Sequence, residues 1–386
     1  MDRELSVLTA LAPVLMAVFG WAAPVVGETC TRAIALAERL GAHGRMYAPL
    51  WGLWANQFVG GRLREGMETA NQVLAMALAT GDPMLEVTGR HGSSYTRFYR
   101  AEYDVALAEA EAGLRQYSFD REILITQIFQ LSSTINILTS KGSSLWMMGR
   151  QDEGIAVMND MLALARSLKH PPSVASALAF RMFFSLYDRD WTRLNEFAEE
   201  TYDLSRAEGF AMWVACAGMH RGRARVGLNQ VEAGLAEVIE WAALFRDMGG
   251  GIMEGSTTSM ESEALHMSRR SDEALIVSAD GERRAEAGMV RIMEPEIYRT
   301  RGDILRDLNR LDDAEVAYRR AVSCARAQGA LSLELRGLTS LLDLQSTRAS
   351  TAEISTALRT ALAGMVCRPD RPDLVAARDL LARIQG

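Results

Sequence analysis

The densest basic cluster of the chain consists of His220 and three arginines, Arg221, Arg223 and Arg225. Guanidinium groups bind phosphate well, because they donate several hydrogen bonds in a fixed geometry. On one helix, however, positions 221 and 225 share a face, whereas position 223 points away from it. The three arginines therefore cannot form one tight phosphate clamp. We predict a solvated helix with ion pairs in preference to a nucleotide site.

The histidines, serines and cysteines lack the spacings that catalysis or metal binding requires. No two histidines lie four residues apart, as two metal ligands on one helix would. The serine pairs at 93–94 and 143–144 are not set in a Gly-x-Ser-x-Gly elbow. The cysteines are widely separated, which favours reduced structural thiols. We therefore expect no catalytic residue, no metal and no cofactor. The histidines and cysteines concerned are His43, His91, His170, His220, His266, Cys30, Cys216, Cys324 and Cys367.

The stretch from Gly250 to Thr257 comes nearest to a phosphate-binding loop, but Ser256 stands where such a loop requires lysine. A glycine-rich loop at the end of a helix is the better interpretation. The sequence also has no alternating strand pattern that could carry the paired metal-binding aspartates of a cyclase. We predict that the chain is not an enzyme. A closed pocket with convergent polar groups of strongly shifted pKa would revive the enzymatic alternative.

Composition favours helices and argues against nucleic acid as a partner. The 386 residues are 48% hydrophobic, contain 9 prolines and carry a net charge of -7. This modest acidity disfavours binding to a phosphate backbone. The apolar stretch from Leu5 to Val26 is interrupted by Pro13, Gly20 and Pro24, so we interpret it as a first helical unit in preference to a signal peptide. We expect no membrane span and a cytoplasmic location.

A unit of about 40 residues recurs along the chain. Its marker, here called the anchor, is the residue that opens the second helix of each unit. Successive anchors are 39, 40, 48, 40, 40, 40 and 40 residues apart. Such regularity indicates a stack of similar helix hairpins in which each unit packs on its neighbours. The anchors are Gly27, Gly66, Ala106, Gly154, Leu194, Gly234, Ala274 and Ala314.

The unit from Pro295 to Gly329 shows how each hairpin is built. Small residues at Gly302 and Ala314 allow two antiparallel helices to approach closely, and Asn309 marks the turn between them. Turns are marked in the same way by Gly61, Gly149 and Asn229, and helix ends by Gly41, Gly81, Gly209, Gly249 and Gly329. At 170–172, His-Pro-Pro ends the helix instead. We interpret residues 116–121, within the interval of 48, as a longer loop or an extended helix.

Residues Gly302, Leu311, Ala314, Tyr318 and Ala321 stand at the spacing of the tetratricopeptide repeat (TPR), which this unit resembles. The resemblance implies an all-α, right-handed superhelical solenoid of about eight TPR-like units. From Leu-Ala-Pro-Val-Leu-Met at 11–16 through Leu-Trp-Gly-Leu-Trp at 50–54 to Arg-Pro-Asp-Leu at 371–374, the whole chain also resembles the C-terminal helical-repeat region of bacterial class III adenylate/guanylate cyclase-related and predicted-ATPase signalling proteins. It is similar as well to the repeat domain of maltose-activator-type transcriptional regulators. We expect one domain over 1–386, with units at 5–41, 42–81, 82–120, 121–170, 171–209, 210–249, 250–288 and 289–329, and C-terminal capping helices at 330–386.

In TPR proteins the first helix of each hairpin lines the concave face, so the family resemblance implies a set of groove residues. By this analogy the groove is aromatic in its first half and charged in its second. Such a groove suits an extended peptide or a partner helix with an apolar and a charged part. Packing between repeats is the alternative role for the same side chains. The implied binding residues are Trp51, Phe58, His91, Tyr95, Phe98, Trp146, Phe183, Tyr187, Arg223, His266 and Arg299, with Asn136, Met219, Glu263, Asp303 and Arg306 at further groove positions.

The leading functional hypothesis is a non-catalytic scaffold that binds a protein or peptide in this groove, in bacterial signal transduction. The alternative is a regulatory tail that senses a small molecule and controls an adenylate cyclase or ATPase module absent from this chain. The sequence leaves open whether the chain is a stand-alone protein or a fragment of a larger one. It also leaves open the ligand and the oligomeric state.

Overall fold

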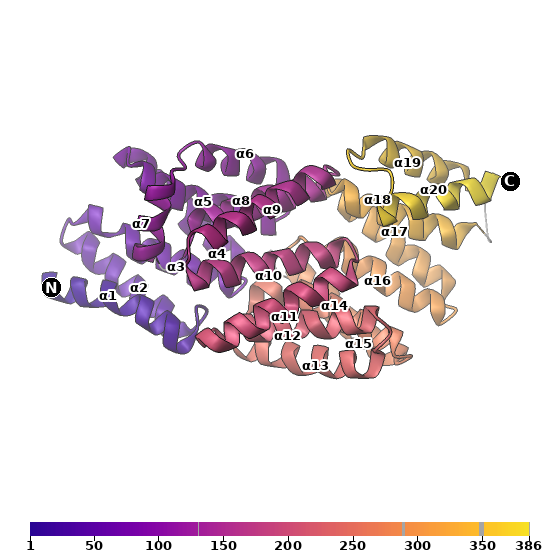
Figure 1. The fold of residues 1–386 in the computed structure, drawn as a ribbon, viewed down its shortest axis with the longest axis horizontal. Helices are drawn as coiled ribbons and strands as arrows, with labels where there is room; N and C mark the ends of the chain where they lie inside the picture. Colours follow the sequence, from indigo (N-terminus) through magenta and orange to yellow (C-terminus); the bar gives the residue numbers. More distant parts are fainter. Residues whose placement is uncertain (130, 288–289, 347–350, 386) are drawn as a thin grey trace.

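In the computed structural model, residues 1–129, 131–287, 290–346 and 351–385 are described, and they form 20 α-helices (Figure 1). The helices follow one another as antiparallel hairpins that stack along the long axis of the molecule, with the two chain ends at opposite ends. The first helices of eight hairpins are α1 (Asp2–Phe19), α3 (Tyr47–Val59), α5 (Pro83–Tyr99), α8 (Ser133–Met147), α10 (Pro171–Tyr187), α12 (Ala211–Gly227), α14 (Glu254–Met267) and α16 (Glu294–Asp307).

The second helices carry the anchors, and each anchor is the fourth residue of its helix. Successive first helices also pack on one another, so they form a continuous layer with the second helices outside it. The second helices are α2 (Pro24–Arg39), α4 (Leu63–Thr80), α6 (Tyr103–Leu114), α9 (Gln151–Ser167), α11 (Trp191–Glu208), α13 (Val231–Asp247), α15 (Ser271–Ala287) and α17 (Leu311–Gln328). The remaining elements are α7 (Phe119–Phe129), α18 (Leu331–Gln345), α19 (Ala352–Gly364), α20 (Pro372–Gln385), η1 (His43–Arg45) and η2 (Gly251–Met253).

Small anchors permit the close crossing of the two helices in a hairpin. A Cβ placed on Gly154 would lie 2.6 Å from the carbonyl oxygen of Gly142, and one on Gly234 would lie 2.5 Å from that of Gly222. Both distances are shorter than van der Waals contact, so glycine is required for these backbones to approach so closely. The crossings expected from small residues in the sequence are confirmed at these two hairpins.

The turn inside seven of the eight hairpins has one backbone conformation regardless of residue type. The residue five positions before the anchor has a positive φ in seven hairpins, including the predicted turn residues Gly61, Gly149, Asn229 and Asn309. Ala101, Arg189 and Arg269 adopt the same conformation, with φ of 61°, 55° and 59°. In the turn at Ala101, Glu102 N donates to Arg97 O (3.0 Å), as in a Schellman motif. Hairpin geometry therefore imposes the left-handed turn even where the sequence offers no glycine.

The long interval between the third and fourth anchors contains a separate short helix, α7. It is neither a longer loop nor an extension of a neighbouring helix, which corrects our interpretation of residues 116–121. The buried carboxylate of Glu122 attaches α7 to the start of α8, because it accepts hydrogen bonds from Ser132 Oγ (2.6 Å) and Thr134 N (3.3 Å). A carboxylate at a helix N-terminus is favourable, since it pairs with unsatisfied N–H groups.

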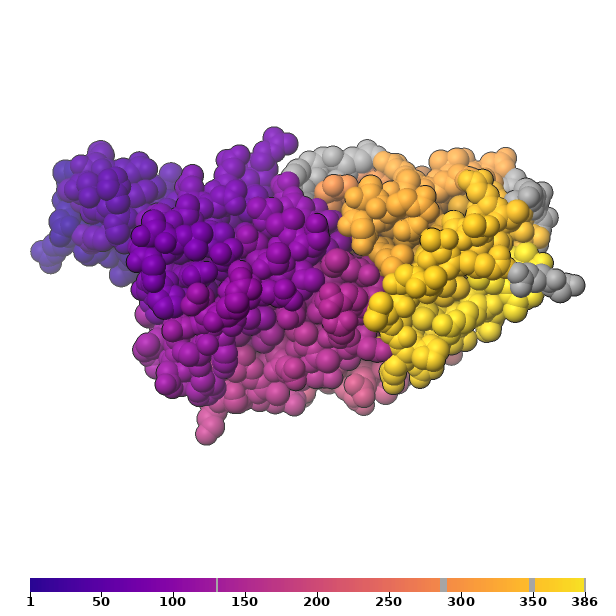
Figure 2. All heavy atoms as spheres, turned by 90° about the horizontal axis from the view of Figure 1, so that it is seen from above, coloured from indigo at the N-terminus to yellow at the C-terminus, as the bar shows by residue number. Residues whose placement is uncertain are grey.

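Successive turns of the superhelix contact one another. Gly61 in the second unit touches the backbone of Gly251 in the seventh, and Arg291 N in the eighth donates to Tyr99 O in the third (2.8 Å). Val366 N, near the C-terminus, donates to Gly149 O in the fourth unit (2.9 Å). Figure 2 shows the C-terminal helices lying directly against residues near 150. The superhelix is therefore closed upon itself along its length.

Two features of the predictions concern residues outside the described set. The predicted unit boundary between residues 288 and 289, and residues 347–350 and 386 of the C-terminal segment, lie outside the described residues. Within the described chain, no single helix is both long and apolar enough to cross a bilayer. Helices α7 and α8 reach such a length and composition only together, and they are bent by 106° relative to each other.

Candidate functional site

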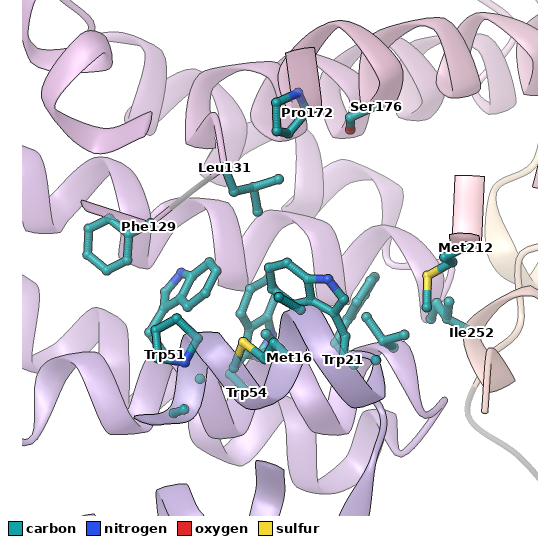
Figure 3. Close-up of a pocket in the computed structure, with 18 of the residues that line it drawn as sticks. Met16, Trp21, Trp51, Trp54, Phe129, Leu131, Pro172, Ser176, Met212 and Ile252 are labelled. Carbon is teal, nitrogen blue, oxygen red and sulfur yellow. The ribbon is translucent and has the colours of Figure 1, made fainter. Parts of the chain in front are cut away.

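The closed superhelix encloses an aromatic cavity of about 730 Å³. The first helices α1, α3 and α5 form one wall, and α10, α12 and η2, from the following part of the superhelix, form the opposite wall. Figure 3 shows Met16, Trp21, Trp51 and Trp54 on one side, with Pro172 and Ser176 across the space from them. Because one wall comes from residues before 100 and the other from residues after 170, the cavity exists only when the superhelix closes.

Helix α7 contributes to the cavity at one end. Phe129, its last residue, packs against Trp51 with ring centroids 5.3 Å apart, and Leu131 follows it into the wall. Figure 3 shows Phe129 beside Trp51 and Leu131 between Trp51 and Pro172. The only described helix that interrupts the repeat is thus placed where it completes this cavity.

The charge state of the cavity wall is set by burial. Burial lowers the pKa of His91 to about 3, so its ring is neutral at physiological pH. Among the described lining residues Glu208 alone carries a charge, and it is exposed to solvent. Trp51 Nε1 and His91 Nδ1 are buried and have no hydrogen-bond partner among the described residues. The cavity is therefore an uncharged, mainly apolar space with little polar lining.

Next to the cavity the aromatic layer continues toward buried charges. Tyr187, at the end of α10, packs on Trp146 with ring centroids 5.2 Å apart. The guanidinium of Arg336, on α18, lies over the same indole at 5.2 Å and donates to the carbonyl oxygen of Tyr187. Trp146 is fully buried, so this contact is part of the packing between superhelical turns.

The second half of the superhelix contains what we call the charged network: Arg223, Glu263, Glu296, Arg299, Asp303 and Arg336. Arg223 Nη2 lies 2.7 Å from Glu263, and Arg299 Nη2 lies 3.3 Å from the same carboxylate. Arg299 also pairs with Glu296 (3.1 Å), and Arg336 pairs with Asp373 (2.7 Å). Burial alone would raise the pKa of Glu263, but Arg223, Arg299 and Arg189 outweigh it and lower the pKa to about 2. Glu263 is therefore ionised throughout the physiological range.

Arg189 differs from the other cations around this network. It lies in the turn between α10 and α11, is exposed, and has no ion-pair partner within 4.0 Å in the described part of the chain. Surrounding protein and the positive charges of Arg299 and Arg336 lower its pKa. Arg189 is therefore a cation that solvent can reach and that lies near both the arginines and the carboxylates of the charged network.

The structure distributes the predicted groove residues over several environments. Five of them, together with Asn136, line the aromatic cavity: Trp51, Phe58, His91, Tyr95 and Phe183. Phe98 and Tyr187 line, with Phe183, a much smaller adjacent cavity of about 10 Å³. Arg223 and Arg299 are buried in the charged network, and Trp146 is buried beneath Arg336. His266 is partly exposed and pairs with Asp307 at 3.1 Å.

Several cavity residues are missing from the sequence-based set. Trp54 and Phe180 lie one helical turn from Trp51 and Phe183, so the helical period could have found them. Met212, Ile252 and Phe129 come from the opposite wall or from α7, and no local pattern marks them. Their placement depends on the closure of the superhelix.

The basic cluster on α12 forms ion pairs, as predicted, but the helix is not solvated as we expected, because His220 and Arg223 are buried between neighbouring helices. Arg221 and Arg225 share Glu237, at 2.9 and 2.7 Å, whereas Arg223 points to Glu263. Within the described residues no group of three potential ligands could hold a metal ion. Burial raises the pKa of Cys216 to about 12, which leaves its thiol protonated.

No model of a protein family matches the sequence, and no curated protein matches it. Among solved structures, the chain is similar to a Rap protein complexed with competence and sporulation factor, at 10% identity and a TM-score of 0.53, covering 91% of this chain and 99% of that one. It is also similar to NprR in complex with its cognate peptide NprX, at 10% identity and a TM-score of 0.51, covering 87% of this chain and 96% of that one. At such identities the likeness concerns the fold alone. The chain is an all-α, TPR-like solenoid.

Proposed function

We propose that the chain is a non-catalytic scaffold that binds a peptide, or a segment of another protein, on the inner side of its superhelix. In this proposal a carboxylate of the bound segment pairs with Arg189. The exposed and unpaired guanidinium of Arg189, beside the buried Arg299 and Arg336, is the observation that carries the proposal. Arginine suits this role, because its planar donors match the two oxygens of a carboxylate.

Groups that can satisfy a peptide backbone lie in the charged network and at the ends of α14, α16 and α18. The side chains of Glu263 and Asp303 in the charged network remain 22% and 26% exposed. The pair of His266 and Asp307 and the pair of Arg306 and Asp343 join the ends of α14, α16 and α18. Each residue of an extended peptide brings an N–H and a C=O group that require partners. Polar side chains of both signs supply them here.

The fold also supports the proposal. The two similar structures contain a Rap protein with competence and sporulation factor, and NprR with its cognate peptide NprX. The same arrangement of helices therefore accommodates such molecules in other proteins. A role in bacterial signal transduction agrees with this likeness, and the association with an adenylate cyclase or ATPase module stays a prediction from the sequence.

Arg189 and Arg269 form a matched pair for testing the proposal. Both occupy the same turn position in their hairpins, both are exposed, and both have a positive φ. A displayed library of dodecapeptides is selected against the purified protein, and selected peptides are measured by fluorescence anisotropy. We expect enrichment of peptides with acidic residues, binding that Arg189→Glu weakens by about ten-fold or more, and little effect of Arg269→Glu.

Two results would contradict the proposal. Selection that yields no saturable peptide binder would exclude a peptide site. Equal losses of affinity in Arg189→Glu and Arg269→Glu, with both proteins folded by circular dichroism, would show that the effect is general electrostatics and that Arg189 is not the contact.

A further inference from the structure

We propose that the aromatic cavity is a second binding site, distinct from the peptide site, and that it takes a small, uncharged and predominantly apolar molecule. The proposal goes beyond the scaffold function, because Arg189 is not among the residues that line the cavity. Its basis is the size of the cavity, the chemistry of its wall and the nature of its mouth.

The size of the cavity matches a small organic molecule. Ligand sites in proteins commonly measure about 300–1,000 Å³, and this cavity measures about 730 Å³. Protein interiors otherwise pack densely with few voids larger than a water molecule. A space of this volume between packed aromatic rings therefore requires an explanation other than ordinary packing.

The wall excludes a charged ligand. Met16, Trp21, Trp54, Phe180 and Trp213 are among the side chains that line the cavity, and the described wall offers no buried charge to pair with an ion. An ion transferred into such a space without a partner loses its hydration and gains little in return. An uncharged aliphatic or aromatic body instead gains from burial against these rings.

The wall also disfavours an extended peptide. A peptide that filled the cavity would bring an N–H and a C=O group with every residue, and each unpaired group is costly to bury. Few polar side chains line the space, and two of these are already engaged: Thr9 Oγ1 donates to Leu5 O (2.9 Å) and Asn136 Nδ2 donates to Ser132 O (2.8 Å). The ligand is therefore a molecule with few hydrogen-bonding groups.

The mouth of the cavity is apolar as well. Three of the lining residues, Val18, Phe19 and Ile128, expose 68%, 62% and 55% of their surface to solvent. Exposed large apolar side chains are typical of sites of interaction. Because these three residues both line the cavity and face solvent, the edge of the cavity that solvent reaches is apolar.

Two buried ring nitrogens in the wall allow the ligand to carry a hydrogen-bonding group. Trp51 Nε1 and His91 Nδ1 are buried and lack partners, and the two rings lie 6.4 Å apart. Buried polar atoms are nearly always hydrogen-bonded in native proteins. A carbonyl or ether oxygen on the bound molecule that reaches this part of the wall would give Trp51 the acceptor it lacks.

The experiment uses the full chain and the uncharged probe N-phenylnaphthylamine, whose fluorescence rises in apolar surroundings. Trp21, Trp51, Trp54 and Trp213, four of the 7 tryptophans, line the cavity, so quenching of protein fluorescence gives a second readout. Bound probe is then displaced with methyl nonyl ketone and, separately, with undecanoate, its carboxylate counterpart. We expect saturable binding of one probe per chain, displacement by the ketone, and displacement by undecanoate that is weaker by about ten-fold or more.

Matched variants locate the site. Ser176→Trp places a large ring in the cavity, and Ser323→Trp places the same ring on the exposed face of α17. We expect probe binding to be lost in Ser176→Trp and kept in Ser323→Trp. Met212→Trp, at a partly exposed position of the wall, provides a second cavity-filling variant if Ser176→Trp fails to fold.

The proposal is overturned if the probe does not saturate, if both cavity-filling variants bind it as the wild type does, or if undecanoate competes as well as the ketone. These outcomes are independent of the peptide site. Arg189→Glu is expected to leave probe binding unchanged, and Ser176→Trp is expected to leave peptide binding measurable, so each proposal can fail without the other.

Discussion

Gly61 and Gly251 touch through their backbones, although 190 positions separate them in the chain. A Cβ on Gly251 would overlap the carbonyl oxygen of Gly60, and a Cβ on Gly61 would lie 2.9 Å from the carbonyl carbon of Gly251. The contact joins the turn of the second hairpin to η2, which itself contributes Ile252 and Met253 to the aromatic cavity. The absence of two side chains thus permits successive superhelical turns to close around the cavity.

Gly251→Ala is expected to lower the free energy of unfolding by about 1–3 kcal/mol, because the new methyl group forces the two turns apart. It is also expected to weaken binding in the aromatic cavity. Urea denaturation measures the first effect. Gly44→Ala is the matched control, since a Cβ there meets no atom within 4 Å. If the two variants have the same free energy of unfolding, a methyl group at position 251 does not disturb the contact between the superhelical turns, and the prediction is wrong.

Arg336→Met is expected to destabilise the protein by about 3–5 kcal/mol. The substitution removes the guanidinium that pairs with Asp373 at 2.7 Å and donates to the carbonyl oxygen of Tyr187, and so leaves buried acceptors without a partner. Arg319→Met on the exposed face of α17, where Arg319 pairs with Glu315, should change stability by less than about 1 kcal/mol. Comparison of the two denaturation midpoints checks the prediction, and similar losses would contradict it.

Ala101→Gly is expected to stabilise the protein by about 0.5–1 kcal/mol. Ala101 has a φ of 61°, where a Cβ is unfavourable and glycine is not. Ala108→Gly, at an exposed position in the middle of α6, should instead destabilise by about 1 kcal/mol, because glycine is a poor helix former. Opposite signs in thermal or chemical denaturation would support the argument. If both substitutions destabilise the protein, the positive φ of Ala101 has no conformational cost that glycine removes, and the prediction is wrong.

Acid is expected to destabilise the protein below about pH 6.5 through two buried histidines. Burial lowers the pKa of His91 to about 3 and that of His220 to about 4, against about 6.5 in an unfolded chain. Above pH 6.5 both rings are neutral in both states. Below it the unfolded state takes up protons that the folded state does not, so stability falls by roughly 1.4 kcal/mol per pH unit for each histidine.

The double variant His91→Phe, His220→Phe should therefore show a flatter dependence of unfolding free energy on pH between about 6.5 and 4. His43→Phe, which replaces an exposed histidine, should leave the slope unchanged. Urea denaturation at several pH values gives the slopes. The prediction concerns the slope and not the absolute stability, so a loss of packing in the double variant does not affect it. An unchanged slope in the double variant would contradict it.

Local chemistry made much of the fold predictable from the sequence. The anchor must be small where two helix backbones cross, as at Gly154, and glycine ends a helix cheaply in the left-handed conformation, as at Gly41 and Gly81. These requirements recur in most of the hairpins, so they leave a period in the sequence. The helical period also placed Trp51, Phe58 and Phe183 on the inner layer, although it did not show which of them would face a cavity.

Tertiary structure alone decided how far the superhelix winds and what it encloses. Each interface between hairpins adds a small rotation. No single sequence motif encodes the total rotation, which brings Gly61 into contact with Gly251 and Arg336 into contact with Tyr187. The accumulated rotation also places Ser176 and Ile252 in the cavity wall with the tryptophans. It leaves Arg189 exposed among buried charges, whereas Arg269, at the equivalent turn position, lies elsewhere. The sequence by itself determined the repeating hairpin, because hairpin contacts are local. The cavity and the charged network depend on contacts between distant repeats, and so only the closed superhelix determines them.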